Sequence, residues 1–379
     1  MKISIIVADS LKKDPRVIKQ IKVAMQAGHE VQFVGYRDEF LDYDFLDGVG
    51  CRYDIVDLGD EYIGKLNSIT KKLKRRLGYP AKAKEYILDF CPDVIHANDF
   101  DMLPTAWSAA KKCGAAVVYD SHEIFAENIG IAEHRFLKQL IILKEKKLVK
   151  KIDHMISVSN AAADYFVEKY KITRPTVITN CPMQSVHPMR KKAVDAFETV
   201  YQGRLVRGRG YEEFTLAAKE LPSGCRIVLR GFGSLENTLR QLIRDHKLED
   251  KVAFKDSVEV SEMICAASES HVGAVLTQPV NLNFRLSVSN KVFEYAAAGL
   301  PVILSDVPEH RYLNEKYHFG IILDEVTPEK IAAAILYLKE HPDVYNEMST
   351  NAKQMFEELN WETESRKLLQ IYEQVAKKK

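Results

Sequence analysis

Two segments in the second half of the chain have the residue types and spacing needed to bind a phosphate-bearing ligand. Segment 201–210 places Arg204 and Arg209 among glycines. Fixed guanidinium charges suit an anion there, because glycine lets the backbone approach a ligand closely. Segment 289–303 predicts a helix start, whose backbone N–H groups suit a phosphate. Glu294, one turn further on, could accept hydrogen bonds from two ribose hydroxyls. Together the segments predict a pocket for a nucleotide diphosphate.

Each segment also has an ordinary structural interpretation. The helix around Glu294 could simply be amphipathic and packed on a sheet, and Arg204 and Arg209 could belong to a basic surface loop. Two anion-suited loops that open consecutive parts of one α/β domain make the pocket the better interpretation of the pair.

Ionisable residues also follow apolar runs in the first half of the chain. Segment 117–123 ends an apolar run with Asp120, His122 and Glu123, at what would be the ligand-facing edge of a parallel sheet. His122 is therefore a candidate functional residue, with a satisfied structural histidine as the alternative. The triplet 99–101 spells Asp-x-Asp, a metal-binding pattern elsewhere, but we favour Asp99 as a helix N-cap with a ligand contact.

A third polar cluster follows the first apolar run, 2–7. Asp14 is predicted to cap a helix whose first position is Pro15, a residue suited to that place. Arg16 follows, and it could either pair with a phosphate of a ligand or anchor the loop.

Composition limits the classes of protein that the chain can belong to. The 379 residues suffice for two domains, and 46% hydrophobic with 28% charged residues is ordinary for a globular protein. The net charge of +1 gives no reason to expect nucleic acid as a partner. The six widely spaced cysteines argue against a disulfide framework or a zinc site and fit a reducing cytoplasm. No apolar stretch approaches the roughly 18 residues that cross a bilayer.

The elements that must position these residues alternate between short apolar runs and helical patterns, which is typical of parallel α/β domains. The predicted strands are 2–7, 30–35, 51–56, 93–97, 115–119, 154–158, 176–179, 198–202, 225–230, 252–254, 271–276, 301–304 and 320–323. The predicted helices of the first half are 15–28, 80–90, 101–113, 134–151 and 159–170.

The region 180–196 loses this periodicity and contains two prolines, so it is predicted to be an interdomain linker. We expect a first domain over 1–185, a second over 197–355 and a helical tail over 356–379. Two such α/β domains are expected to form a cleft between the carboxyl ends of their strands.

Two stretches are rich in lysine and arginine. Residues 63–84 contain eight basic and no acidic side chains, with apolar residues at helical spacing, and 138–151 has a second basic cluster. A basic amphipathic helix suits an anionic membrane surface, and a solvated helical face is the alternative.

Three motifs together resemble the donor half of the retaining glycosyltransferases of family 4, the group 1 glycosyltransferases. They are Gly203-Arg204-Leu205 with Arg209-Gly210, then Arg230-Gly231-Phe232-Gly233, then Ser289-Asn290-Lys291-Val292-Phe293-Glu294-Tyr295 followed by Gly299-Leu300-Pro301. The resemblance covers nearly the whole chain. It implies the GT-B fold: two Rossmann-like domains that face each other across a cleft, with a C-terminal helix that crosses back to the first domain.

The resemblance also implies a function and a set of sites. The expected activity is metal-independent transfer of a sugar, with retention of configuration, from a nucleotide-diphosphate sugar (UDP-sugar is the commonest) to a glycan or lipid-linked acceptor, in bacterial surface polysaccharide biosynthesis. A cytoplasmic enzyme, peripheral at the inner face of the membrane, is expected. The implied catalytic residues are His122, Arg204, Arg209 and Glu294. The implied donor-binding residues are Gly203, Arg204, Arg209, Gly231, Phe232, Gly233, Ser289, Asn290, Lys291 and Glu294. The implied acceptor-binding residues are Asp14, Arg16 and Asp99.

The chain departs from the family pattern at two positions. Relatives carry two glutamates separated by seven residues; Glu294 matches the second, but Leu286 stands where the first contacts the donor sugar. Arg209 replaces the usual lysine of the glycine-rich loop, which keeps the charge but changes its geometry. A non-hydrolysing nucleotide-sugar epimerase of the same fold and a non-catalytic nucleotide-sugar-binding partner subunit therefore remain alternatives.

Overall fold

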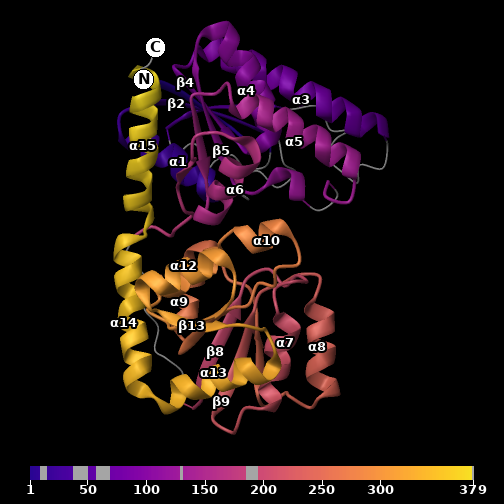
Figure 1. Ribbon diagram of the computed structural model, residues 1–379, viewed down its shortest axis with the longest axis vertical. Helices are drawn as coiled ribbons and strands as arrows, with labels where there is room; N and C mark the ends of the chain where they lie inside the picture. Colours follow the sequence, from indigo (N-terminus) through magenta and orange to yellow (C-terminus); the bar gives the residue numbers. More distant parts are fainter. Residues whose placement is uncertain (9–14, 37–49, 57–68, 129–130, 185–194, 378–379) are drawn as a thin grey trace. The chain divides into compact units, whose positions relative to one another are not determined.

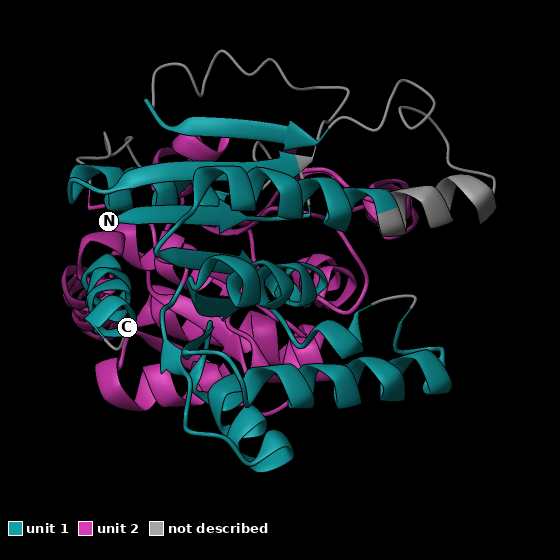
Figure 2. Ribbon diagram, turned by 90° about the horizontal axis from the view of Figure 1, so that it is seen from above, with its two compact units in different colours: residues 1–179, 365–379 teal, residues 180–364 magenta. Residues whose placement is uncertain are grey.

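The computed structural model describes residues 1–8, 15–36, 50–56, 69–128, 131–184 and 195–377. Within these ranges the chain divides into two compact units, Met1–Thr179 with Ser365–Lys379, and Asn180–Glu364 (Figure 2). The predicted domain borders are 185, 197 and 355. In the structure, the chain passes from one unit to the other after Thr179 and again after Glu364. No helix in the described parts of the chain is long and apolar enough to cross a membrane.

In the described part of the first unit, seven parallel strands form one sheet in the order β3-β2-β1-β4-β5-β6-β7. These strands are β1 (Lys2–Ile6), β2 (Glu30–Tyr36), β3 (Arg52–Val56), β4 (Val94–Asn98), β5 (Ala116–Ser121), β6 (His154–Ser157) and β7 (Thr176–Val177). Its helices are α1 (Pro15–Gln26), α3 (Ile69–Phe90), α4 (Asp99–Cys113), α5 (Arg135–Val149) and α6 (Asn160–Tyr170), with a short 3-10 turn at Phe125–Glu127. The strand order reverses between β1 and β4, the type of position where such sheets bind ligands.

In the described part of the second unit, six parallel strands follow the order β10-β9-β8-β11-β12-β13. They are β8 (Phe197–Gln202), β9 (Cys225–Arg230), β10 (Val252–Lys255), β11 (Val272–Val275), β12 (Val302–Ser305) and β13 (Gly320–Leu323). The helices are α7 (Tyr211–Leu216), α8 (Glu236–Asp245), α9 (Met263–Ala267), α10 (Leu282–Leu286), α11 (Asn290–Ala297), α12 (Pro308–Tyr317), α13 (Pro328–Glu340) and α14 (Pro342–Glu358), with 3-10 turns at Ala217–Lys219 and Val260–Glu262 (Figure 1).

The second sheet is buried on both faces because successive strand residues point to opposite sides. Tyr201 and Leu229 pack with side chains of α7, α8 and α13, whereas Val200 and Val228 pack with α9, α11, α12 and α14. Burial of both faces explains why the strands appear in the sequence as continuous apolar runs. The predicted parallel α/β architecture is confirmed, and every predicted strand is present.

Two helical expectations need comment. The described parts of the predicted segments 63–84 and 80–90 form one helix, α3 (Ile69–Phe90), with Pro80 in its interior. Proline suits the first position of a helix, which made 80 look like a start, but one lost backbone hydrogen bond is tolerated here. The predicted tail helix is α15 (Trp361–Lys377), and it belongs to the second unit up to Glu364 and to the first from Ser365.

Candidate functional site

The carboxylate of Glu294 is held at the end of β8. Gln202, the last residue of that strand, donates from Nε2 to Glu294 Oε2 at 3.2 Å. Its backbone N–H donates to the hydroxyl of Tyr295, the neighbour of Glu294, at 2.9 Å. Gln202 therefore orients the Glu294 carboxylate, which is predicted to bind a ribose. It does so from a strand end at the switch point between β8 and β11. Gln202 is not among the predicted site residues, although a polar residue at the end of an apolar run was a usable signal.

The loops after β8 and β9 lie against each other, and glycine makes this approach possible. A Cβ at Gly231 (φ 139°) would lie 1.9 Å from the carbonyl oxygen of Gly203, and one at Gly233 would lie 2.2 Å from that of Leu205. The loops are also hydrogen-bonded, from Leu205 N to Phe232 O at 2.9 Å. Gly231 and Gly233 were predicted to bind the donor; in the structure, their lack of a side chain admits the neighbouring loop. Phe232, between them, is 62% exposed.

Arg209 is the more enclosed arginine of the glycine-rich loop. Its guanidinium carbon lies 5.5 Å from the ring centroid of Phe284 on α10, and its Nε is buried without a hydrogen-bond partner among the described residues. The Tyr201 hydroxyl donates to the Arg209 carbonyl at 2.7 Å and so fixes the backbone. Arg204 is exposed. One arginine is thus stacked and half-buried, and the other is exposed at the surface of the same loop.

Lys291 brings a further positive charge to this loop from α11. Its side chain is buried (8% exposed) and packs under Gly203, where an added Cβ would lie 2.7 Å from Lys291 Cε. Burial, and next the charge of Arg209, lower the pKa of Lys291 to about 8, against a partly compensating effect of Glu294. An anion beside Arg209 and Lys291 would offset both the burial of the Lys291 ammonium and its repulsion by Arg209, and so would raise the pKa of Lys291. The family's loop lysine is replaced in sequence by Arg209, and Lys291 supplies an ammonium beside the same loop.

A helix begins where the sequence predicts it, at the start of α11. Ser289 occupies the N-cap with φ −76° and ψ 133°, and its side chain makes no capping hydrogen bond. Asn290 is exposed. The positive end of this helix dipole is therefore available to an anionic group.

In the first unit, His122 lies just after β5 and is held by two residues from the end of β4. Its Nε2 is 3.0 Å from Asn98 Oδ1, and since the Asn98 amide nitrogen donates to Ile6 O, Nε2 carries the proton. Asp99 Oδ1 accepts from the His122 backbone N–H at 3.0 Å, and Asp99 Oδ2 lies 3.6 Å from Nδ1. The imidazole is therefore oriented, and partly exposed at 17%.

Asp99 does not have the predicted capping role. The helix α4 begins at Asp99 itself, Asn98 is the N-cap residue without a side-chain cap, and the Asp99 carboxylate turns to His122. Asp99 has a positive φ of 60°, an uncommon conformation for a non-glycine residue. Burial raises the pKa of Asp99 to about 7, opposed by His122 and reinforced by Asp101 and Glu123. The Asp99 carboxyl can therefore exchange a proton near neutral pH.

Arg16 forms a buried ion pair with Asp120 beneath this site. Its Nε and Nη2 donate to the two Asp120 oxygens at 2.8 and 3.0 Å, and Nη1 donates to Ile178 O at 2.9 Å. Both side chains are almost fully buried, at 3% and 0% exposed. Burial opposes ionisation of Asp120, but Arg16 and His122 outweigh it and keep the pKa of Asp120 well below its usual value. Of the two alternatives for Arg16, this geometry matches the anchor.

Two predicted regions fall partly or wholly outside the described residues. Asp14 lies in the undescribed range 9–14, and residues 63–68 of the first basic segment lie in the undescribed range 57–68. The second basic segment, 138–151, is described, and it forms most of α5.

Comparisons with known proteins identify the family and the fold of the chain. Residues 17–181 match the family Glycosyltransferase Family 4, and residues 186–355 match Glycosyl transferases group 1. The chain belongs to this family, and it is a glycosyltransferase of the family 4, group 1 type. An uncharacterized glycosyltransferase of Methanocaldococcus jannaschii is 19% identical over 245 residues, which are 61% of this chain and 61% of that relative.

Solved structures show the same fold at low sequence identity. Sucrose-phosphate synthase from Thermosynechococcus elongatus has a TM-score of 0.79 at 16% identity, over 100% of both chains. HepE from Anabaena, in a complex with UDP-glucose, has a TM-score of 0.71 at 16% identity, over 100% of this chain and 99% of that one. These likenesses confirm the predicted GT-B fold.

Proposed function

We propose that the protein transfers a sugar from a nucleotide-diphosphate sugar, with UDP as the nucleotide, to a glycan or lipid-linked acceptor with retention of configuration. The observation that carries the proposal is the meeting of Arg209 and Lys291 at one glycine-rich loop, with Glu294 held nearby by Gln202. Two adjacent cations suit the two phosphates of a diphosphate, and an oriented carboxylate suits a ribose. The complex of HepE with UDP-glucose supports UDP as the nucleotide.

The proposed chemistry uses these residues on the leaving group. Negative charge grows on the diphosphate as the bond from the sugar to the phosphate oxygen breaks, and Arg204, Arg209 and Lys291 would stabilise it. The acceptor hydroxyl attacks on the same face, and the departing diphosphate takes its proton. The proposal gives metal ions no part, because the protein's own cations supply the charge. His122 is assigned to contact the donor sugar, as the family resemblance implies.

The first test is binding of nucleotides without metal. Since a ligand that binds only the folded state stabilises it, UDP at a hundredfold excess over its Kd should add about 2.7 kcal/mol to the free energy of unfolding. Arg209→Ala should lose this shift, whereas Arg244→Ala, an exposed arginine on α8, should keep it. A wild-type protein that no nucleotide diphosphate stabilises would contradict the proposal.

The second test separates the proposal from its alternatives. Incubation with UDP-sugars and candidate acceptors should release UDP only when an acceptor is present, and the product's anomeric proton in NMR should match the donor's configuration. An epimerase would instead convert the donor without an acceptor, and a binding subunit would retain the donor unchanged. A role for Glu294 predicts in addition that Glu294→Ala reduces discrimination between UDP and 2′-deoxy-UDP.

An anionic membrane surface is proposed as a partner of α5. Phe136, Leu140 and Leu143 are 79%, 48% and 62% exposed, and their spacing places them on one side of the helix. Exposed lysines of the same helix end flank this apolar stripe, at Lys144 and Lys147. Exposed apolar side chains beside lysines suit insertion at a negatively charged interface, where a lipid-linked acceptor would reside.

Vesicle sedimentation tests this partner. The protein should pellet with phosphatidylglycerol vesicles and not with phosphatidylcholine vesicles, and Phe136→Ser with Leu143→Ser should abolish pelleting. Val260→Ser is a matched control, because Val260 is 64% exposed in the second unit. Equal pelleting of the double variant and the wild type would rule out α5 as the contact.

A further inference from the structure

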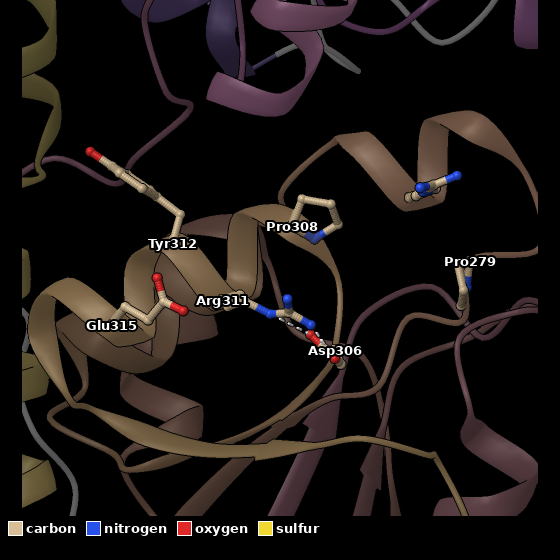
Figure 3. A pocket seen from close by; sticks show the side chains of 7 residues that line it. Pro279, Asp306, Pro308, Arg311, Tyr312 and Glu315 are labelled. Atoms are coloured by element: carbon tan, nitrogen blue, oxygen red, sulfur yellow. Dashed lines mark hydrogen bonds and ion pairs between the residues drawn. The ribbon is translucent and has the colours of Figure 1, made fainter.

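A second concave site lies on the second unit, beside the glycine-rich loop but separate from it. This pocket has a volume of about 430 Å³, within the roughly 300–1,000 Å³ of small-molecule sites. Its walls come from α12, from the turn before it, from α10 and from Pro279 (Figure 3). We call it the α12 pocket.

The helix α10 separates the α12 pocket from the proposed diphosphate site. Phe284 lies against Arg209 and Gly208, whereas the next residue, Arg285, lines the pocket. Likewise Val280 packs near Gly208, and its neighbour Pro279 lines the pocket. A group bound in the α12 pocket would thus lie across one short helix from the diphosphate.

The chemistry of the lining is mixed and electrically balanced. Two cationic side chains, Arg285 and Arg311, and two anionic ones, Asp306 and Glu315, line the pocket. Arg311 donates to both oxygens of Asp306, at 3.1 and 2.5 Å, a pair visible in Figure 3. Because the formal charges cancel, the pocket has little reason to select a phosphate or a carboxylate. It instead presents acceptors and donors side by side, which is what a ligand with several hydroxyl groups requires.

An exposed aromatic ring completes the lining. Tyr312 is 47% exposed, and in Figure 3 its side chain projects outward from α12. A tyrosine offers an apolar face together with a polar hydroxyl. A pyranose ring has the complementary pattern, with C–H groups on its faces and hydroxyls around its rim.

The polar part of the pocket is preorganised by the turn that precedes α12. The buried His310 contacts Ser305 O through Nδ1 at 2.9 Å, and Asp306 N donates to Leu323 O at 3.1 Å. Pro308 begins the helix. Since the turn is held by these contacts and Asp306 is already paired with Arg311, a ligand would have little backbone to order on binding.

From these observations we propose that the α12 pocket binds a neutral pyranose unit of a saccharide substrate. The doubly hydrogen-bonded Asp306–Arg311 pair hydrogen-bonds its hydroxyls, and Tyr312 packs against its ring. This inference deepens the proposed function, on which it rests for the source of the sugar, either the donor or the acceptor glycan.

The test is direct saccharide binding to the full chain, measured without nucleotide. Saturation-transfer NMR with methyl glycosides of glucose, galactose, mannose and N-acetylglucosamine, each at about 10 mM, should detect at least one ligand. Tyr312→Ala should weaken its binding by at least about tenfold. Tyr337→Ala should leave it unchanged, since Tyr337 is 43% exposed on α13 and lines no part of the pocket. Asp306→Asn should weaken binding as well, because it disrupts the paired geometry.

Three results would overturn the proposal: no neutral glycoside binds, Tyr312→Ala binds as the wild type does, or glucose 6-phosphate binds and its neutral counterpart does not. UDP affinity is measured in parallel and should be the same in Tyr312→Ala and the wild type. A loss of UDP affinity would make the pocket part of the nucleotide site, against the proposal. Failure of UDP binding in the wild type would count against the proposed function alone.

The source of the sugar follows from transfer kinetics. A raised KM for the acceptor glycan in Tyr312→Ala, with the UDP-sugar KM unchanged, assigns the pocket to the acceptor. The reverse pattern assigns it to the sugar of the donor. No change in either KM would contradict a substrate role.

Discussion

The hydroxyl of Tyr372 on α15 lies 2.6 Å from Nδ1 of His96 on β4, across 276 positions of sequence. Burial raises the pKa of Tyr372, so its hydroxyl keeps its proton and donates it. His96 Nε2 then lies 3.7 Å from Asp120, and Asp120 is also 3.7 Å from Nε2 of His122. A row of buried side chains thus connects the last helix of the chain with the candidate site of the first unit.

Tyr372→Phe should destabilise the protein, because it leaves the buried Nδ1 of His96 without its donor. The expected loss in the free energy of unfolding is about 1–3 kcal/mol, measured by calorimetry. Tyr337→Phe removes a hydroxyl from a 43% exposed ring and should cost much less. Similar melting of the two variants would show that the Tyr372 hydroxyl does not hold α15 to the sheet.

Replacing one partner of the Arg16–Asp120 pair should be far more costly than replacing one of a surface pair. Asp120→Asn leaves a buried guanidinium uncompensated, with an expected loss of about 3–5 kcal/mol. The control is Asp164→Asn, whose partner Arg174 is 2.8 Å away with both side chains exposed, and it should cost about 1 kcal/mol or less. If Arg16 instead contacts the acceptor, Arg16→Lys should raise the acceptor KM at unchanged stability.

Gly231→Ala should disrupt the pair of loops that carries the proposed diphosphate site. The new methyl group would meet the backbone oxygen of Gly203, which cannot move as a side chain can. Both the melting temperature and UDP binding should fall. Gly224→Ala has a similar left-handed strain, at φ 80°, but its nearest neighbour is 3.8 Å away at the tip of Lys339. Loss of UDP binding in Gly224→Ala alone would refute this explanation.

UDP binding should take up protons above pH 8. The pKa of Lys291 is lowered to about 8 in the free protein, and a bound diphosphate would raise it. At pH 9 Lys291 is therefore mostly neutral when free and charged when bound, so uptake should approach about one proton per UDP and should nearly vanish at pH 7. Phosphate groups with a second pKa near 6 do not contribute at pH 9.

Calorimetric titrations in buffers of different ionisation enthalpy measure this uptake. Lys291→Met should bind UDP more weakly and take up no proton at pH 9. Lys353→Met, a substitution of an exposed lysine on α14, should behave as the wild type does. Equal uptake in wild type and Lys291→Met would place the titrating group elsewhere.

Asp99 should make stability fall as the pH rises from about 4 to 7. Its pKa is raised from 3.8 to about 7 by burial, so over this interval the folded state holds a proton that the unfolded state has released. The contribution is at most about 1.4 kcal/mol per pH unit. Asp99→Asn keeps an acceptor for the His122 N–H and should remove this slope. Parallel stability curves for the two proteins between pH 5 and 8 would contradict the raised pKa.

The sequence by itself determined the architecture and the segments that contain the candidate residues. Both follow from local information: each buried strand of a parallel sheet is a short apolar run, and each motif keeps glycines and charges within a few positions of one another. The strand predicted at 198–202, observed as β8, and the helix start predicted near Ser289 are examples.

Only the tertiary structure decided which polar groups hold the candidate residues in place. Gln202 reaches Glu294, Lys291 reaches the loop of Gly203, and Asp99 turns to His122 instead of capping its helix. Tyr372 meets His96 although no sequence signal relates them. Such pairs depend on which strand ends become neighbours in the sheet, and long-range chain packing sets that order. Local propensity and spacing do not encode it.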